Sequence, residues 1–221
     1  MPVGTNPSGQ APAMGAGLED PHDERCPPIY RPEPASVYHN FTHPVTGIKA
    51  ATMPRTDANT VQHSLTSGTI YWIAFGGLRG QVISAATMLT GDAAKTGGTH
   101  GWYAVADKTM TVIGVTADQT DAATVWGATG TFYPLSFTQP FILGYTGAYY
   151  FGYMIAETAG TMPDFTGCPN LQAGASNGTG ITSPLILAGS GATGRTTPPT
   201  LGTTYDAPSA LANALPYVYF T

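Results

Sequence analysis

The stretch TIYWIAF at Thr69–Phe75 decides the fold class of this 221-residue chain. Successive side chains of a β-strand point to opposite faces, so every second residue of this stretch can face a core. A second stretch, AYYFGYMI at Ala148–Ile155, is apolar on both faces. Such a strand is either covered on both sides or contributes one aromatic face to a subunit interface. The two stretches together predict a protein built of strands.

Similar short runs follow one another from Val61 onward, separated by clusters of Gly, Asp and Thr. This spacing is typical of a sandwich or a barrel. We predict an all-β fold, a jelly-roll-like antiparallel β-sandwich of eight strands over residues 61–221. The strands are expected near Gly68–Phe75, Gln81–Leu89, Gly101–Ala106, Met110–Thr116, Thr131–Thr138, Ala148–Glu157, Pro184–Ala188 and Pro216–Thr221. Asp107, ahead of Lys108 and Thr109, predicts a tight hairpin turn.

The composition favours strand and loop over helix. Charged residues make up 10% of the chain, against roughly 25% in an average soluble domain. Exposed helices need Glu, Lys, Arg and Gln on their outer faces, whereas Thr, Tyr, Val and Ile suit a pleated surface. The segment from Phe165 to Asn213 is rich in Gly, Ser, Thr and Pro and is expected to be mostly loop.

Residues 1–60 contain 10 of the 19 prolines. In PHDERCPPIYRPEP, Pro21–Pro34, the prolines are too close for a helix or a central strand. Burial-favouring side chains nevertheless punctuate the segment. We predict an extended N-terminal arm that docks onto neighbouring subunits, although composition alone favours a disordered tail for Met1–Gly17. The docking residues are expected to be Ile29, Tyr30, Val37, Tyr38 and Phe41.

Charge and hydropathy exclude several classes of function. A net charge of −5 gives no general attraction to phosphate backbones, so no nucleic-acid partner is expected. The chain begins without a signal-peptide pattern and lacks a run of about 18 apolar residues, so we expect synthesis in the cytoplasm and no membrane insertion. Cys26 and Cys168 are interpreted as incidental thiols, with a disulfide between them as the alternative.

No motif supports catalysis, and we predict a non-enzymatic protein without cofactor or metal. Gly189–Gly194 fits a dinucleotide-binding pattern, but prolines follow where that site needs a helix. Gly174–Gly178 fits the nucleophile elbow, but every histidine precedes it. His39 and His43 have metal-ligand spacing in a proline-interrupted, non-helical stretch. The aspartates of the β region mostly occupy turn positions, which leaves no obvious glycosidase pair.

Aromatic residues are the remaining candidates for ligand binding, because sugars stack on exposed aromatic faces. Trp126 lies in the loop-like stretch DAATVWGATG and is the best candidate of the three tryptophans for an exposed ring. The preferred interpretation is that it plugs one end of the sandwich or an oligomer interface. His100 and Trp102 are the other candidate ligand-binding residues, and a structural histidine is the alternative for His100.

The chain resembles a recurring β domain of actinobacterial bacteriophage virion proteins, most often labelled minor tail proteins. The resemblance rests on THGWYAV at Thr99–Val105, preceded by the Val82–Leu89 run and followed by GAYYFGYM at Gly147–Met154, and it covers about Gln81 to Phe165. It implies a jelly-roll-like sandwich on the virion, usually oligomeric, with carbohydrate contact.

From the residues and this resemblance we expect a virion structural protein of the minor tail or tail-tip type. Its partners would be other virion proteins and copies of itself, most simply in a homotrimer. A capsid decoration protein, a head-fibre protein and a carbohydrate-binding module for host recognition are the alternatives. The module would bind cell-surface carbohydrate.

Overall fold

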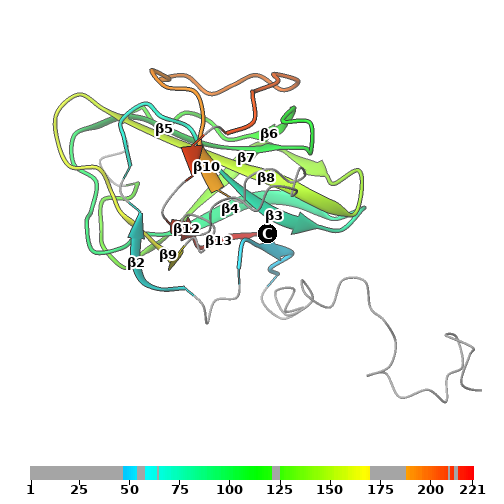
Figure 1. Ribbon diagram of the computed structural model, residues 1–221, viewed down its shortest axis with the longest axis horizontal. Coiled ribbons are helices and arrows are strands. Elements are labelled where there is room, and N and C mark those ends of the chain that lie inside the picture. The colour runs from blue at the N-terminus through cyan, green and yellow to red at the C-terminus, as the bar shows by residue number, and fades with distance from the viewer. Residues whose placement is uncertain are drawn as a thin grey trace, which may run out of the picture. The chain divides into compact units, whose positions relative to one another are not determined.

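The computed structural model describes residues 47–53, 58–63, 65–120, 125–169, 188–208, 210–211 and 214–221, and all regular structure in these ranges is strand (Figure 1). The described residues belong to one unit of the chain, Tyr38–Thr221. The predicted docking residues of the arm lie outside the described residues. These are Ile29, Tyr30, Val37, Tyr38 and Phe41.

The strands of the described residues, in chain order, are as follows. They are β1 (Ala50–Ala51), β2 (Asn59–His63), β3 (Tyr71–Gly77), β4 (Val82–Leu89), β5 (Gly98–Ala106), β6 (Val112–Val115), β7 (Phe132–Ile142), β8 (Gly147–Glu157), β9 (Phe165–Pro169), β10 (Ala188–Ser190), β11 (Ala210–Leu211), β12 (Ala214–Pro216) and β13 (Val218–Phe220).

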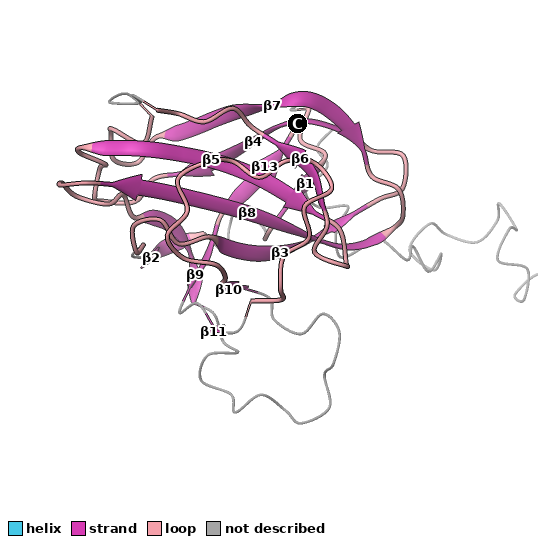
Figure 2. Cartoon of the chain, turned by 90° about the horizontal axis from the view of Figure 1, so that it is seen from above, coloured by secondary structure: helices cyan, strands magenta, loops and turns pink. Residues whose placement is uncertain are grey.

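Three antiparallel sheets contain these strands. A four-stranded sheet has the order β1-β13-β4-β7, and a six-stranded sheet has the order β11-β10-β3-β8-β5-β6. A smaller sheet, β12-β9-β2, begins where Thr90 pairs with Phe165 just beyond the end of β4. Figure 2 shows β4 and β7 on one side of the sandwich and β3 and β8 on the other. The all-β sandwich predicted from the sequence is confirmed.

Four of the strand pairings are nested inside one another along the chain. β1 pairs with β13, β3 with β8, β4 with β7 and β5 with β6. Two further pairings, β13 with β4 and β5 with β8, join the nested pairs into the two larger sheets. The chain therefore runs as one long antiparallel ribbon that is folded over itself.

The main core lies between the two larger sheets. β3 directs Tyr71, Ile73 and Phe75 into it, as the alternation in the sequence predicts. The four-stranded sheet contributes facing side chains such as Met88 and Phe220, and the Phe75 and Phe220 rings stack with centroids 4.2 Å apart. Half of the buried residues of this cluster are aromatic, and such rings each bury a large apolar area.

The outer face of the six-stranded sheet is also buried, beneath residues 191–207, which we call the cover segment. Trp72, Trp102, Tyr150 and Met154 are buried on this face, with Ala192 and Tyr205 of the cover segment packed against the same cluster. Figure 1 shows the cover segment as the orange loop beside β10, β5 and β6. Strand β8, which is apolar on both faces, is thus covered on both sides by the chain itself, the first of the two alternatives expected from the sequence.

The cover segment is fastened to the sheet by backbone hydrogen bonds at both ends. Just before β3, Ile70 N donates to Ala192 O (3.0 Å) and Gly68 O accepts a hydrogen bond from Arg195 N (2.9 Å). At β6, Val112 N donates to Thr203 O at 2.8 Å. Since β8 and β5 lie between β3 and β6, the segment crosses the width of the sheet.

The predicted strands match the structure best in the centre of the chain. The turn at Asp107 is confirmed, because its carboxylate accepts hydrogen bonds from Thr109 N at 2.8 Å and Thr111 N at 3.1 Å. The predicted strand Pro184–Ala188 reaches the described residues only at Ala188, which begins β10. β1 and the start of β2 lie within the range 1–60 assigned to the arm, yet both pair with strands of the sandwich.

Candidate functional site

Trp126 is fully buried, with 0% of its surface exposed. Its indole N–H donates to the Tyr103 hydroxyl at 2.9 Å, and the Lys95 ammonium lies 5.3 Å from its ring centroid. Gly101 of β5 makes room for it, because a Cβ there would come within 2.4 Å of the indole. Trp126 is therefore not available as an exposed stacking platform, and its burial agrees with the preferred interpretation that it plugs the sandwich.

Trp102 is also fully buried, on the outer face of β5 beneath the cover segment. Trp72 occupies the same layer on β3, and its indole lies across β8, where a Cβ at Gly152 would come within 2.5 Å of it. None of the three tryptophans presents a face to solvent, so none can act as a surface stacking platform in this structure. The loop composition around Trp126 gave no sign of this burial.

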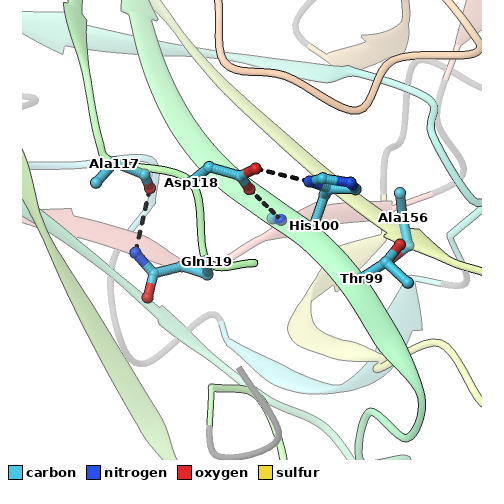
Figure 3. A network of polar contacts seen from close by, with 7 residues as sticks. Thr99, His100, Ala117, Asp118, Gln119 and Ala156 are labelled. Atoms are coloured by element: carbon cyan, nitrogen blue, oxygen red, sulfur yellow. Dashed lines mark hydrogen bonds and ion pairs between the residues drawn. The ribbon is translucent and has the colours of Figure 1, made fainter. Parts of the chain in front are cut away.

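His100, the third candidate, lies at the edge of the sandwich and is held by Asp118 (Figure 3). Its Nδ1 lies 2.6 Å from one carboxylate oxygen of Asp118, and the other oxygen accepts a hydrogen bond from Gly101 N at 3.1 Å. A carboxylate only accepts hydrogen bonds, so Nδ1 carries the proton. The side chains of His100 and Asp118 are 30% and 16% exposed, which leaves one edge of the imidazole in solvent.

Sequence reasoning missed Asp118 as the partner of His100. The signal lies in the hairpin register: continuing the pairing of Ala104 with Val115 brings Asp118 opposite Gly101. Gln119 N donates to Gly101 O at 2.8 Å, which extends the ladder past the end of β6. Asp118 thus accepts a hydrogen bond from the backbone N–H of Gly101 and orients the ring of His100. This arrangement agrees with the alternative that His100 has a structural role.

The chemistry open to this pair is limited. An oriented imidazole can accept a proton at Nε2, but nucleophilic catalysis also needs a hydroxyl or thiol within hydrogen-bond reach. Within the described ranges no such group is bonded to His100, and the neighbouring Thr99 hydroxyl donates instead to Ala156 O at 3.3 Å. The described residues also hold no group of three or more His, Cys, Asp or Glu side chains placed to bind a metal.

Buried phenols are the strongest electrostatic feature of the core. Burial raises the pKa of Tyr103 and Tyr153 well above the ordinary value, because ionisation would leave a charge inside an apolar layer. Burial likewise raises the pKa of Tyr145 to about 12, although a hydrogen bond from the backbone N–H of Lys108 lowers this pKa in part. These phenols stay neutral at physiological pH, with Tyr103 and Tyr153 inside the core and Tyr145 partly buried against it.

No protein-family model matches the chain, and no relative is found among curated proteins. No helix in the described ranges combines the length and apolarity needed to cross a bilayer.

Proposed function

We propose that this chain is a structural protein of a bacteriophage particle, of the minor tail or tail-tip type, and that it acts in assembly through contacts between subunits. The observation that carries the proposal is the nested strand pairing. Eight strands make up the nested pairs, namely β1, β3, β4, β5, β6, β7, β8 and β13. When these strands are numbered one to eight in chain order, one sheet has the order 1-8-3-6 and the other contains the order 2-7-4-5. This order is the one expected of a jelly roll, a fold of viral capsid and lectin domains, and it supports the proposal.

The resemblance to phage virion proteins around Thr99–Val105 and Gly147–Met154 supports the same assignment. A fold alone does not define a function, so the assignment to the particle rests on this resemblance and the fold together. A capsid decoration or head-fibre protein would use the same fold with a different partner.

Self-association as a homotrimer is part of the proposal, and the surface offers a candidate contact. Val82 and Ile142 lie directly opposite each other on β4 and β7 and are 41% and 66% exposed. Pro134 and Pro140 lie in β7, an edge strand, and proline removes the backbone donor that strand addition needs. A partner at this edge would therefore pack on side chains such as Ile142.

Light scattering on the purified chain tests the self-association. A trimer is expected for the unmodified chain, and Ile142→Asp is expected to dissociate it, because a charge cannot be buried unpaired in an apolar contact. Leu201→Asp is the matched control, since Leu201 is 44% exposed but lies on the cover segment. A monomeric unmodified chain would exclude the trimer, and equal effects of the two variants would exclude the Val82–Ile142 contact.

Assembly itself is tested by deleting residues 1–46 in phage-producing cells and analysing purified particles by mass spectrometry. The deletion ends at residue 46 because Lys49 N donates to Phe220 O and Ala50–Ala51 pairs with β13. The shortened chain is expected to fold but to be absent from particles that contain the full chain. Absence of the full chain from particles would overturn the virion assignment, and incorporation of the shortened chain would overturn the docking role of the arm.

A further inference from the structure

The four-stranded sheet directs alternate side chains to two faces. One row of paired residues points inward and belongs wholly to the main core. Its members are Ala50, Phe220, Ala86 and Leu135. The adjoining row points outward, because successive side chains of a strand alternate between the faces of a sheet. Its members are Ala51, Tyr219, Thr87 and Pro134.

The outer face of this sheet is neutral. None of the residues in β1, β4, β7 and β13 is Asp, Glu, Lys, Arg or His. Charged side chains usually lie on the surface of a protein, and they are depleted at the centre of an interface between proteins. The composition of the sheet therefore favours an outer face that a partner covers.

The small sheet covers one end of the outer face. Leu89, Phe132 and Tyr219 form a cluster there with Leu215 of β12 and Cys168 of β9. Farther along β7 the outward side chains are exposed, and so is Val82, which pairs with Ile142. We call this surface the open face, and it consists of Val82, Pro134, Ser136, Thr138, Pro140 and Ile142.

A partner of the open face has to pack on its side chains. Pro134 and Pro140 remove two backbone donors from β7, so a further strand cannot add to this edge with a full ladder of hydrogen bonds. Val82 and Ile142 offer apolar surface at the far end. The surface therefore suits a neutral segment with apolar side chains.

The sequence ahead of β1 contains such a segment. Every Asp, Glu, Lys and Arg of residues 1–46 lies between Glu19 and Glu33. The stretch PASVYHNFTHPVT, residues 34–46, follows without one. Its residues Val37, Phe41 and Val45 are four positions apart, so an extended backbone directs all three side chains to the same side.

The length and the place of this segment match the open face. At about 3.4 Å per residue, an extended segment 37–46 spans about 34 Å, and the eleven residues of β7 span about 37 Å. The segment ends beside the sheet, because Lys49 N donates to Phe220 O at 2.8 Å. Since the open face is exposed in the single chain, another copy is the source of its cover.

We propose that the open face binds residues 37–46 of a neighbouring copy. This inference rests on the proposed function, in which the arm docks onto another subunit, and it names the surface that receives the arm. Val37, Phe41 and Val45 pack on the prolines of β7 and on Ile142, which buries apolar area without removing a charge from water. The charged stretch 19–33 stays outside the contact.

Photocrosslinking of the full-length chain tests the contact. Phe41 is replaced by the photoreactive residue p-benzoylphenylalanine, and the irradiated protein is separated by denaturing electrophoresis. A crosslink between copies gives a covalent dimer, whereas a crosslink within one chain does not. We expect a covalent dimer whose crosslinked peptide, identified by mass spectrometry, contains residues of the open face. The same probe in place of Met14, ahead of the charged stretch, is expected to give no such product.

A charge placed on the open face provides the matched comparison. Ser136→Lys is expected to lower the yield of covalent dimer about tenfold or more, because the new ammonium loses water in a neutral contact. Thr197→Lys adds the same charge to the cover segment and is expected to leave the yield unchanged. Both positions are exposed, so the thermal unfolding midpoint of each variant should match that of the unmodified chain.

The outcomes separate the docking surface from the docking itself. Crosslinks between copies at another surface, an equal yield from the Met14 probe, or equal yields from the two lysine variants would overturn the assignment of the open face and leave arm docking in place. Crosslinks confined to one chain would overturn both the assignment and the docking role of the arm. A chain that forms no covalent dimer and is monomeric by light scattering would contradict the proposed self-association as well.

Discussion

The two faces of the six-stranded sheet are both buried, but they satisfy their polar groups differently. On the inner face, Trp126 donates to Tyr103, Thr66 N donates to the Tyr71 hydroxyl at 2.9 Å and the Tyr149 hydroxyl donates to Tyr145 O at 2.9 Å. On the outer face, the indole N–H groups of Trp72 and Trp102 are buried without a hydrogen-bond partner in the described structure.

This difference shows how each face is specified. An unsatisfied buried donor costs about 1–3 kcal/mol, so the outer face gives up stability that the inner face keeps. Hydrogen bonds to aromatic residues fix ring positions on the inner face, whereas the cover segment holds the outer face mainly through backbone bonds at its ends. The inner face should therefore respond more strongly to perturbation.

The largest effect is expected at alkaline pH. The folded-state pKa values of Tyr103, Tyr153 and Tyr145 are raised above 10, so unfolding lets these phenols ionise. Their stabilisation is fully present below pH 10 and is lost as pH rises toward about 12. Denaturant unfolding followed by circular dichroism at stepped pH measures this loss. Stability that stays constant over this pH range would contradict the burial of these phenols.

Cavity variants compare the faces directly. Phe151→Ala on the inner face is expected to cost about 3–5 kcal/mol, because the ring contacts Tyr103 on the neighbouring strand and Phe220 across the core. Met154→Ala on the outer face is expected to cost about 2 kcal/mol, since the cover segment can relax onto the space. Chemical denaturation gives both values. If Met154→Ala lowered the free energy of unfolding as much as Phe151→Ala does, the two faces would not differ in this respect.

Removal of single indole N–H groups sharpens the comparison. Trp126→Phe is expected to cost about 2–3 kcal/mol, because it removes packing and leaves the buried Tyr103 hydroxyl without its donor. Trp102→Phe is expected to cost about 1 kcal/mol, because loss of the unsatisfied N–H offsets part of the lost packing. Thermal unfolding of the two variants side by side measures the difference. The reverse order would indicate that Trp102 has a partner.

The smallest effect is expected on the outer surface of the cover segment. Leu201→Ser replaces a side chain that is 44% exposed and is expected to change the free energy of unfolding by about 0.5 kcal/mol or less. A loss above this value, measured by the same denaturation, would show that the cover segment contributes more to stability than its exposed surface implies.

The strands of the centre could be predicted from the sequence because alternation and β-branched runs are local signals. Tyr71, Ile73 and Phe75 lie on the core face as their spacing indicates. The short strands β1, β9 and β12 could not be predicted, since two to five residues carry no period and their pairing depends on distant partners.

The candidate site was predicted less well, for a physical reason. The small and polar residues around Trp126 made it the candidate for an exposed ring, but its burial depends on Gly101, 25 positions earlier in the sequence, which leaves space for the indole. Long-range packing of this kind leaves no periodic signal in the sequence.

The place of β13 sets an order of events during synthesis. Val218–Phe220 pairs on one side with β1 and on the other with β4, yet it leaves the ribosome after every other described strand. The four-stranded sheet cannot form completely until these residues emerge. Met88 and Ala50 therefore lack their pairing partners in β13 while translation continues. Contacts between such distant residues also slow folding, because the loop between them must be closed first. A nascent chain that stalls before residue 218 would leave one face of the aromatic core exposed to chaperones and proteases.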